Sequence, residues 1–542
     1  MNILSHNIFR LFSIGCCFLL FGCGARKTLV EIGDREQILH LGNSSEPKDL
    51  DPHIVTGVTE HNIISALIEG LVSENPKTLE PVPGTSDRWE VSANGLEYRF
   101  HIRENAKWSN GDPISAQDFV FSYRRILSPR LGAPYAYMLF CLKNAEKYNN
   151  GEITDFSKVG VKAESPDTLL LSLNSPTPYF LSMLNHYSWF PVHAPTILSF
   201  GKIDTIGSNW TKPGNFIGNG AFTLTKWKAN QEIAVTASSN YWDKSTLSLK
   251  EIHFYPIGDH AIEERAFRAG QLHVTGTVPI DRIAYYQEKK PEVLRLDPYL
   301  GCYYYLFNVA KPPLDNPKIR QALALAIDRD KIVKYVVKGG EDPALHFTPP
   351  NTGGYTSRSK IEGNLDLAKK LFAEAGYPEG KDFPVLSLLY NTADAHARIA
   401  AVLQQMWKEN LGIEIQMVNM EWKVYLDATQ NANYDIARAG WIADYVDPTT
   451  FLDMWVTDGG NNRSGWSNKE YDDFIKKASK TADKTERYEL LQKAEAILMK
   501  ELPIMPIYFY RSKSLIRESV KGWHSTILDH HPYKYIRLSV VD

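Results

Sequence analysis

Residues 89–122 read WEVSANGLEYRFHIRENAKWSNGDPISAQDFVFS. Within this stretch, apolar and polar residues alternate from position 96 to position 103, which is the period of a half-buried β-strand. The following Asn110-Gly111-Asp112-Pro113 predicts a turn, and Ser115 predicts the start of a helix because its side chain caps free backbone N–H groups. A strand, a turn and a capped helix in this order indicate a domain that mixes helices with strands.

Further strands and helices are expected on both sides of this segment. Short apolar runs predict strands at residues 38–41, 168–173, 233–236 and 504–510. Helix signals mark residues 317–327, which follow Asn316, residues 364–375, which end at Gly376, and residues 469–500. Because strands and helices do not alternate strictly, we expect α/β or α+β lobes.

The composition is that of an ordinary globular protein. The chain has 542 residues, with 60 Lys and Arg against 63 Asp and Glu, which gives a net charge of -3. This balance argues against nucleic acid or an anionic membrane surface as the main partner. Aromatic residues make up 12% of the chain, which suits a lined binding cleft as well as a large core.

The N-terminal residues predict an export signal. An apolar run of about a dozen residues follows Arg10, which is too short for a spanning helix of about 20 residues. The run ends in Leu20-Phe21-Gly22-Cys23, which resembles a bacterial lipobox and implies lipidation of Cys23 after removal of residues 1–22. An ordinary cleaved signal is the alternative. A short polar linker is expected from Gly24 to about Arg35, before the first strand.

No motif in the body of the chain indicates catalysis or metal binding. The sequence lacks GxxxxGK[ST], HExxH and GxSxG, and it has no GxGxxG after a strand. The pair His530-His531 is expected to form a polar turn rather than a metal face, and no cofactor is expected. Two cysteines remain beyond the signal, Cys141 and Cys302, and the sequence leaves open whether they pair or stay free thiols.

Residues 89–122 as a whole closely resemble the signature segment of the family 5 extracellular solute-binding proteins, the oligopeptide- and dipeptide-binding subunits of ABC importers. The segments SEPKDLDPH at 45–53 and NWTKPGNFIGNGAF at 209–222 match the same family, as does the region from Tyr303 to Arg329. The resemblance implies a two-lobed α/β fold of the periplasmic-binding-protein type (type II, cluster C), with an additional domain and a hinge between the lobes.

The resemblance also implies a division into domains. After the signal peptide (1–22) and a lipid-anchored linker (23–37), domain I is expected to comprise residues 38–58, 190–301 and 511–542. Domain II is expected at 59–189 and domain III at 302–510.

Residues 434–448, YDIARAGWIADYVDP, look like the ligand strand of the oligopeptide-binding branch. An extended peptide presents unpaired backbone groups, which a protein strand satisfies without reading side chains. The resemblance implies that strand at Gly440, Trp441 and Ile442, and a matching edge from the other lobe at Glu46, Pro47 and Lys48. It places the anion for the peptide's ammonium at Asp444, because a desolvated charge without a partner costs several kcal/mol.

Cations for ligand carboxylates are implied at Arg438 and His396. The match is incomplete, because Thr429 stands where the family has a further arginine, and a family lysine matches only if Lys338 is shifted by one place. In the family, the cysteine at the position of Cys302 pairs with a second cysteine. Ile442 stands at the position of that second cysteine here, so Cys302 is not expected to form the family's disulfide. Aromatic residues expected to line side-chain pockets are Tyr135, Tyr137, Tyr304, Trp422, Trp441 and Tyr445.

The resemblance therefore implies a monomeric, lipid-anchored receptor on the periplasmic or extracellular face that captures short peptides by lobe closure. It would deliver them to a membrane permease driven by a cytoplasmic ATPase, without any enzymatic step. Other solutes remain open within the same fold: a murein peptide, glutathione, haem, a nickel chelate or an oligosaccharide. An exported hydrolase and a surface adhesin are the alternatives from other classes.

Overall fold

The structure is a computed structural model that describes residues 27–540. The signal peptide and the lipidation site predicted at Cys23 lie outside the described residues. Within the described range, no helix has the length and apolar character needed to cross a membrane.

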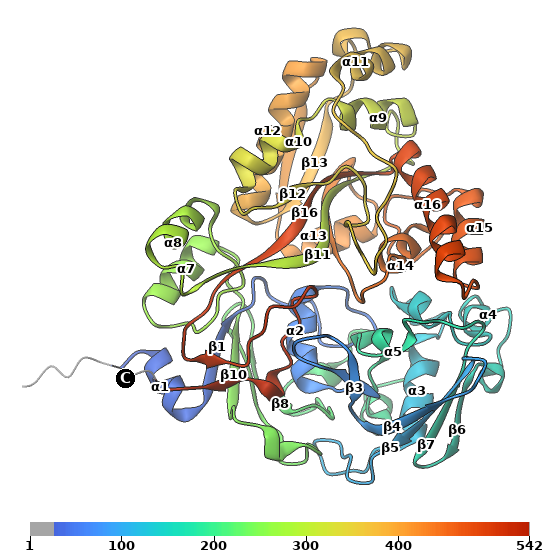
Figure 1. Cartoon of the computed structure of the whole chain (residues 1–542), viewed down its shortest axis with the longest axis vertical. Coiled ribbons are helices and arrows are strands. Elements are labelled where there is room, and N and C mark those ends of the chain that lie inside the picture. The colour runs from blue at the N-terminus through green and yellow to red at the C-terminus, as the bar shows by residue number, and fades with distance from the viewer. Residues whose placement is uncertain (1–26, 541–542) are drawn as a thin grey trace, which may run out of the picture.

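The lower lobe in Figure 1 is built on two four-stranded sheets. The first has the order β1 (Ile38–Gly42), β10 (Glu251–Tyr255), β9 (Glu232–Ala237) and β8 (Phe222–Lys228), in which only the β1–β10 pair is parallel. The second is antiparallel, in the order β4 (Ser86–Val91), β5 (Glu97–Ile102), β7 (Thr168–Ser172) and β6 (Val161–Ser165). Two strand pairs complete the sheets: β2 (Val72–Glu74) with β3 (Pro81–Pro83), and β17 (Val520–Lys521) with β18 (Arg537–Leu538).

The upper lobe is built on one six-stranded mixed sheet (Figure 1). Its order is β12 (Asp342–Pro343), β16 (Ile504–Leu515), β11 (Leu294–Phe307), β15 (Ile436–Ile442), β13 (Leu386–Asn391) and β14 (Ile415–Met420). The apolar residues 504–509 of β16 are buried, because this strand lies between β12 and β11 inside the sheet. Helices on both sides of the sheet then cover its faces.

Sixteen α-helices complete the described chain, and half of them precede β11. These are α1 (Leu29–Glu36), α2 (Val58–Leu67), α3 (Ala116–Ile126), α4 (Ala145–Asn149), α5 (Phe180–Met183), α6 (Ala194–Ser199), α7 (His260–Arg268) and α8 (Ile283–Lys289). The other half are α9 (Pro317–Leu325), α10 (Arg329–Lys331), α11 (Leu365–Glu374), α12 (Asp394–Leu411), α13 (Trp422–Gln430), α14 (Thr449–Leu452), α15 (Lys469–Ala478) and α16 (Lys484–Glu501).

The long strands β11 and β16 connect the two lobes. At one end, Leu294 and Leu515 pack in a small separate core with residues of α7 and α8, while at the other end both strands lie inside the upper sheet (Figure 1). Their pairing is interrupted between Pro298 and Cys302. The domain boundaries expected at 301/302 and 510/511 fall beside this interruption. A break in a two-stranded ladder bends easily, so this region is suited to a hinge.

The segment quoted first forms the elements that its pattern predicts. The alternating residues form β5, and Ser115 caps α3 in a capping box with Asp118. Between them, the side chains of Asn110 and Asp112 bond across the turn at 2.7 Å, and Gly111 has φ of +96°, which a residue with a side chain rarely adopts. This segment belongs to the lower lobe, whereas β15 belongs to the sheet of the upper lobe.

The linker prediction is wrong for residues 29–36, which form helix α1. Thr28 caps this helix through a capping box with Glu31, a local signal that the polar composition obscured. The Val30 N–H donates to the carbonyl of Gly270 at 2.9 Å, and Oδ1 of Asp34 lies 3.3 Å from Nε2 of His273. The helix is thus docked on the lower lobe. The two body cysteines, Cys141 and Cys302, are free thiols.

A buried ion pair fixes the segment 45–55 that runs to the cleft between the lobes. The Arg125 guanidinium on α3 donates to both carboxylate oxygens of Asp51, at 2.8 and 2.5 Å, and both side chains are buried. The Nδ1 atom of His53 accepts a hydrogen bond from the same guanidinium at 3.0 Å, and its Nε2–H donates to the Phe190 carbonyl at 3.1 Å. Burial acts to raise the pKa of Asp51, but the Arg125 charge holds that pKa below its ordinary value.

We predict that Asp51→Asn lowers the free energy of unfolding by about 3 kcal/mol or more, because it leaves the Arg125 charge buried without its anion. Urea unfolding followed by circular dichroism measures the loss. The matched control is Asp87→Asn, which removes an equally charged group from an exposed pair with Arg88 and is expected to change stability by less than about 1 kcal/mol. Equal losses in the two variants would contradict the assignment.

Candidate functional site

Strand β15 has a free edge that faces the space between the lobes. The Ala443 N–H donates to the Leu300 carbonyl, so by the alternation of an antiparallel ladder Gly440 and Ile442 direct their backbone groups away from β11. On that other side, β13 pairs only with Ile436 and Ala437. The backbone groups of Gly440 and Ile442 are therefore available to an added strand.

Gly440 has a steric reason to be glycine. A Cβ at this position would lie 2.4 Å from the hydroxyl of Tyr510 and 3.3 Å from Nη2 of Arg438. The residue is exposed, whereas its neighbours on the strand, Ala439 and Trp441, are buried. The backbone at this point can thus be approached closely.

Asp444 follows the strand and lies at one end of the free edge. Its side chain is only 9% exposed. Its oxygens lie 3.5 Å from the Tyr135 hydroxyl, 3.5 Å from the Thr450 hydroxyl and 3.3 Å from Nε2 of His186. Within residues 27–540, no lysine or arginine nitrogen lies within 4.0 Å of this carboxylate. Asp444 is thus a nearly buried anion without a permanent cation.

Arg438 lies at the other end of the same edge. Its guanidinium donates to the Tyr510 hydroxyl at 2.6 Å and to Oδ1 of Asn391 at 3.3 Å, and it lies 4.6 Å from the ring centre of Tyr303. Its Nε is buried without a hydrogen-bond partner in the described part of the chain. No carboxylate of that part lies within 4.0 Å of the guanidinium. The Arg438 guanidinium is therefore available to bind an anion.

His396 lies beside Arg438, and its surroundings disfavour the charged form. Its Nδ1 is 3.3 Å from the Tyr303 hydroxyl. Burial lowers the pKa of His396 well below its ordinary value, and the charges of Arg438 and His260 lower it further. The imidazole can donate a hydrogen bond to a carboxylate, and its role as a cation requires that a bound anion first raise its pKa.

Residues Glu46, Pro47 and Lys48, expected as a matching edge for a bound peptide, lie in an irregular segment. No strand is present there; Glu46 and Pro47 are buried, and the Glu46 carboxylate accepts from Trp227 Nε1 at 2.6 Å and from the Asn230 N–H at 2.9 Å. The Lys48 N–H donates to Glu60 at 2.7 Å, so it is already satisfied. The Glu46 contacts involve its side chain and not its backbone, so the edge expected at residues 46–48 stays a prediction.

The aromatic candidates occupy different surroundings. Tyr135 lies 4.6 Å from His186 and 6.1 Å from Trp441, between ring centres, beside Asp444. Trp441 donates to the Thr450 carbonyl at 2.7 Å. The others lie as follows: Tyr445 stacks on Tyr179, Trp422 stacks on Tyr425, Tyr137 accepts from Asn461, and Tyr304 is buried against Phe347 and Trp455 in the core of the upper lobe.

Contacts across the cleft hold the lobes together. Tyr179 of the lower lobe stacks on Tyr445 of the upper lobe at 5.2 Å, with ring planes 3° apart. The Ser175 hydroxyl donates to the Ser479 carbonyl at 2.6 Å, and Lys48 pairs with Asp427 at 2.6 Å. Tyr135 reaches Asp444 across the same boundary. The structure thus shows a closed arrangement.

Three residues at the cleft have no sequence motif around them. His186 and Tyr179 come from short loops around α5. Arg463, which contacts Thr56 of the lower lobe, comes from the turn region before α15. Only the chain fold brings them to the cleft. A run of aromatic and histidine residues at 179–190 is the one feature that could have drawn attention to that loop.

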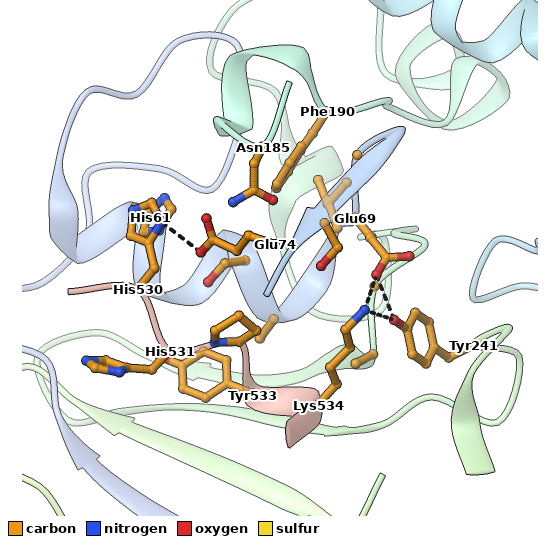
Figure 2. A pocket seen from close by; sticks show the side chains of 18 residues that line it. His61, Glu69, Glu74, Asn185, Phe190, Tyr241, His530, His531, Tyr533 and Lys534 are labelled. Atoms are coloured by element: carbon orange, nitrogen blue, oxygen red, sulfur yellow. Dashed lines mark hydrogen bonds and ion pairs between the residues drawn. The ribbon is translucent and has the colours of Figure 1, made fainter. Parts of the chain in front are cut away.

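A cavity of about 340 Å³ adjoins Asp444, with Glu74, Asn185 and Leu528 among its walls. It shares Ser73, Glu74 and Asn185 with a larger cavity of about 610 Å³ in the lower lobe, shown in Figure 2. The two cavities therefore adjoin each other, and Asp444, at one end of the free edge, lines the smaller one.

Charged groups in the larger cavity are paired with one another. His530 stacks on His61 at 4.7 Å and bonds Glu74 at 2.8 Å, and Lys534 pairs with Glu69 at 3.0 Å (Figure 2). The polar turn expected at His530-His531 is thus part of a packed wall rather than a free turn. Within residues 27–540 there is no group of three or more His, Cys, Asp or Glu side chains that could hold a metal ion.

The fold and this site define a solute-binding protein whose two lobes close over a cleft. The model of the bacterial extracellular solute-binding proteins, family 5, matches residues 80–463, and the chain belongs to this family. Proteins of this family are binding components of transporters and not enzymes. The mixed α/β fold of the cluster C periplasmic binding proteins, expected from the sequence, is confirmed by the solved structures.

Similar proteins include the periplasmic oligopeptide-binding protein OppA of Salmonella typhimurium, which is 36% identical over 504 residues, with 91% of each chain covered. Among solved structures, the murein tripeptide-binding protein MppA of Escherichia coli has a TM-score of 0.88 at 35% identity, covering 93% of this chain and 98% of that one. The OppA of Haemophilus influenzae in complex with RPPGFSPFR has a TM-score of 0.88 at 32% identity, covering 93% and 99%.

A second structure of MppA identifies the conformation. The unliganded open form of that protein gives a TM-score of only 0.61 at the same 35% identity, covering 93% of this chain and 97% of that one. The sequence relationship is the same in both comparisons, so the difference lies in the arrangement of the lobes. The present structure is therefore unlike the open form, in agreement with the contacts across its cleft.

We predict that Tyr179→Ala shifts the protein toward an open form. An offset aromatic pair contributes about 0.5–1.5 kcal/mol, so its loss should raise the ratio of open to closed molecules by a factor of about 2 to 13. Small-angle X-ray scattering measures the fraction of each form. Tyr335→Ala removes an exposed tyrosine of the upper lobe and should leave the ratio unchanged. An identical ratio in all three proteins would rule out the stacking contact as a closing contact.

Proposed function

We propose that this protein binds short peptides and serves as the receptor of a peptide ABC importer. The observation that carries the proposal is the pair of opposite charges, Asp444 and Arg438, at the two ends of one free strand edge. A peptide in its ionised form presents an ammonium, a row of backbone groups and a carboxylate in the same order. The similarity to OppA proteins supports this reading.

The charges also give the direction of the bound peptide. With its ammonium at Asp444 and its carboxylate toward Arg438, the peptide lies antiparallel to β15 and pairs with Gly440 and Ile442. The two residues are six positions apart, which is roughly 20 Å of extended chain. The Arg438 side chain reaches toward Gly440, with Nη2 3.3 Å from where a Cβ of that residue would lie, so the site suits peptides of about three to five residues.

Backbone pairing makes the site tolerant of peptide sequence, since it reads no side chain. Closure of the lobes over the peptide creates the form that docks on a membrane permease, whose ATPase subunits drive transport. In this proposal the protein acts as a monomer on the outer face of a membrane, and the lipid on Cys23 holds it there. Two or three acyl chains are sufficient for stable anchoring.

A murein peptide is the second candidate ligand. It is favoured by the close similarity to MppA, and it carries the amine and carboxylate that Asp444 and Arg438 require. Titration of a murein tripeptide against tri-alanine separates the two candidates. A preference above tenfold for the murein peptide would make it the physiological ligand class.

We predict that Asp444→Asn weakens binding of tetra-alanine at least tenfold, because the peptide ammonium loses its anion in a nearly buried site. Calorimetric titration measures the affinity, and acetylation of the peptide N-terminus should weaken binding to the wild type by a similar factor. Asp382→Asn, a charge change at an exposed position, is the control. An unchanged affinity in a correctly folded Asp444→Asn protein would remove the amine-anchor assignment.

A further inference from the structure

A third cavity lies between the lobes and contains an arginine that the predicted site did not include. Its volume is about 320 Å³. The lower lobe contributes Lys48, Thr56 and Glu60 to its walls, and the upper lobe contributes Gln430 and Arg463. A group placed there would touch both lobes at once.

The Arg463 side chain is held in place by neutral groups only. Its guanidinium donates to the hydroxyl of Thr429 and to the hydroxyl of Thr56, both at 3.3 Å. Its backbone is fixed by the Tyr434 hydroxyl, which donates to the Arg463 carbonyl at 2.6 Å. Among residues 27–540, no carboxylate oxygen lies within 4.0 Å of this guanidinium. Two long hydrogen bonds to hydroxyls orient the charge but do not neutralise it.

The other charged groups of the cavity are already engaged. Lys48 pairs with Asp427 at 2.6 Å, and Glu60 accepts the Lys48 N–H at 2.7 Å. Burial raises the pKa of Glu60, which lowers the charge that it presents to the cavity. Arg463 is therefore the charged side chain of this cavity that lacks an opposite charge in the described part of the chain, and the cavity favours an anion.

Arg463 contacts the residue that replaces an arginine of the family. That residue, Thr429, stands where the family resemblance expects an arginine, and it is completely buried on α13. One turn earlier on that helix, the Tyr425 hydroxyl donates to the carbonyl of Arg438. Arg463 thus brings a cation from another segment to the helix that borders the Arg438 end of the cleft.

We propose that Arg463 binds a carboxylate of the captured solute and forms a second anion subsite beside that of Arg438. This inference rests on the proposed function as a peptide receptor and adds a specificity-determining residue to it. Two sources share the chemistry: the C-terminal carboxylate of the peptide and the side chain of an acidic residue within it. Closure brings Thr56 against the guanidinium, so the subsite is complete only when the lobes are together.

The test compares wild type, Arg463→Gln and Arg463→Lys by calorimetric titration with two sets of peptides. The first set is tetra-alanine with a free or an amidated C-terminus. The second set is tetra-alanine in which Glu or Gln stands at position two, three or four. Arg88→Gln, which removes an exposed arginine of the lower lobe, is the matched control.

For one of the two sources, we expect wild type to favour the peptide that carries the carboxylate about tenfold or more. Arg463→Gln should bind both members of that pair within about twofold of each other, Arg463→Lys should keep part of the preference, and Arg88→Gln should keep all of it. Loss of the preference in the amidation set assigns the terminal carboxylate, and loss in the Glu/Gln set assigns an acidic side chain.

If Arg463→Gln keeps every preference of the wild type, the subsite assignment is overturned while the proposed function stands. If wild type binds none of the peptides in either set, the proposed function fails, and the inference about Arg463 fails with it.

Discussion

A charge that leaves water must meet an opposite charge, or the folded protein loses several kcal/mol. Several buried ions among the described residues meet that requirement internally, as Asp51 does with Arg125 and Asp447 with Arg487. Asp444 and Arg438 do not, although both lie beside the same strand and both are largely enclosed. Their unmet charges, at the two ends of an unpaired backbone edge, favour a solute that carries both an amine and a carboxylate.

Closure and binding are coupled through this constraint. The residues that enclose Asp444, above all Tyr135 and His186, belong to the lower lobe, whereas Asp444 itself belongs to the upper lobe. Opening the cleft at the interrupted pairing of β11 and β16 returns the carboxylate to water, where it needs no partner. A ligand that brings an ammonium therefore favours the closed form, because only that form needs the added charge.

The sequence was sufficient for the scaffold, and it pointed to both ends of the proposed site but not to the residues around them. The pattern at 96–103 and the cap at Ser115 predicted β5 and α3 because both signals are local. The family resemblance of residues 434–448 pointed to Asp444 and Arg438, and the structure places both beside the free edge.

What the sequence could not show depends on contact between segments far apart in the chain. The Glu46 side chain meets Trp227 and Asn230, and the Lys48 N–H meets Glu60. Burial lowers the pKa of His396, and the neighbouring Arg438 charge lowers it further. Arg463 had no motif, and only the structure shows that its guanidinium meets Thr429.

The most direct test of the central claim is a crystal structure of the protein, residues 24–542, with tetra-alanine bound. The account predicts that the peptide lies antiparallel to β15, with its ammonium on the Asp444 carboxylate, its backbone bonded to Gly440 and Ile442, and its carboxylate toward Arg438. A peptide in the reverse direction, or one that leaves the Asp444 carboxylate without a cation, would contradict the account.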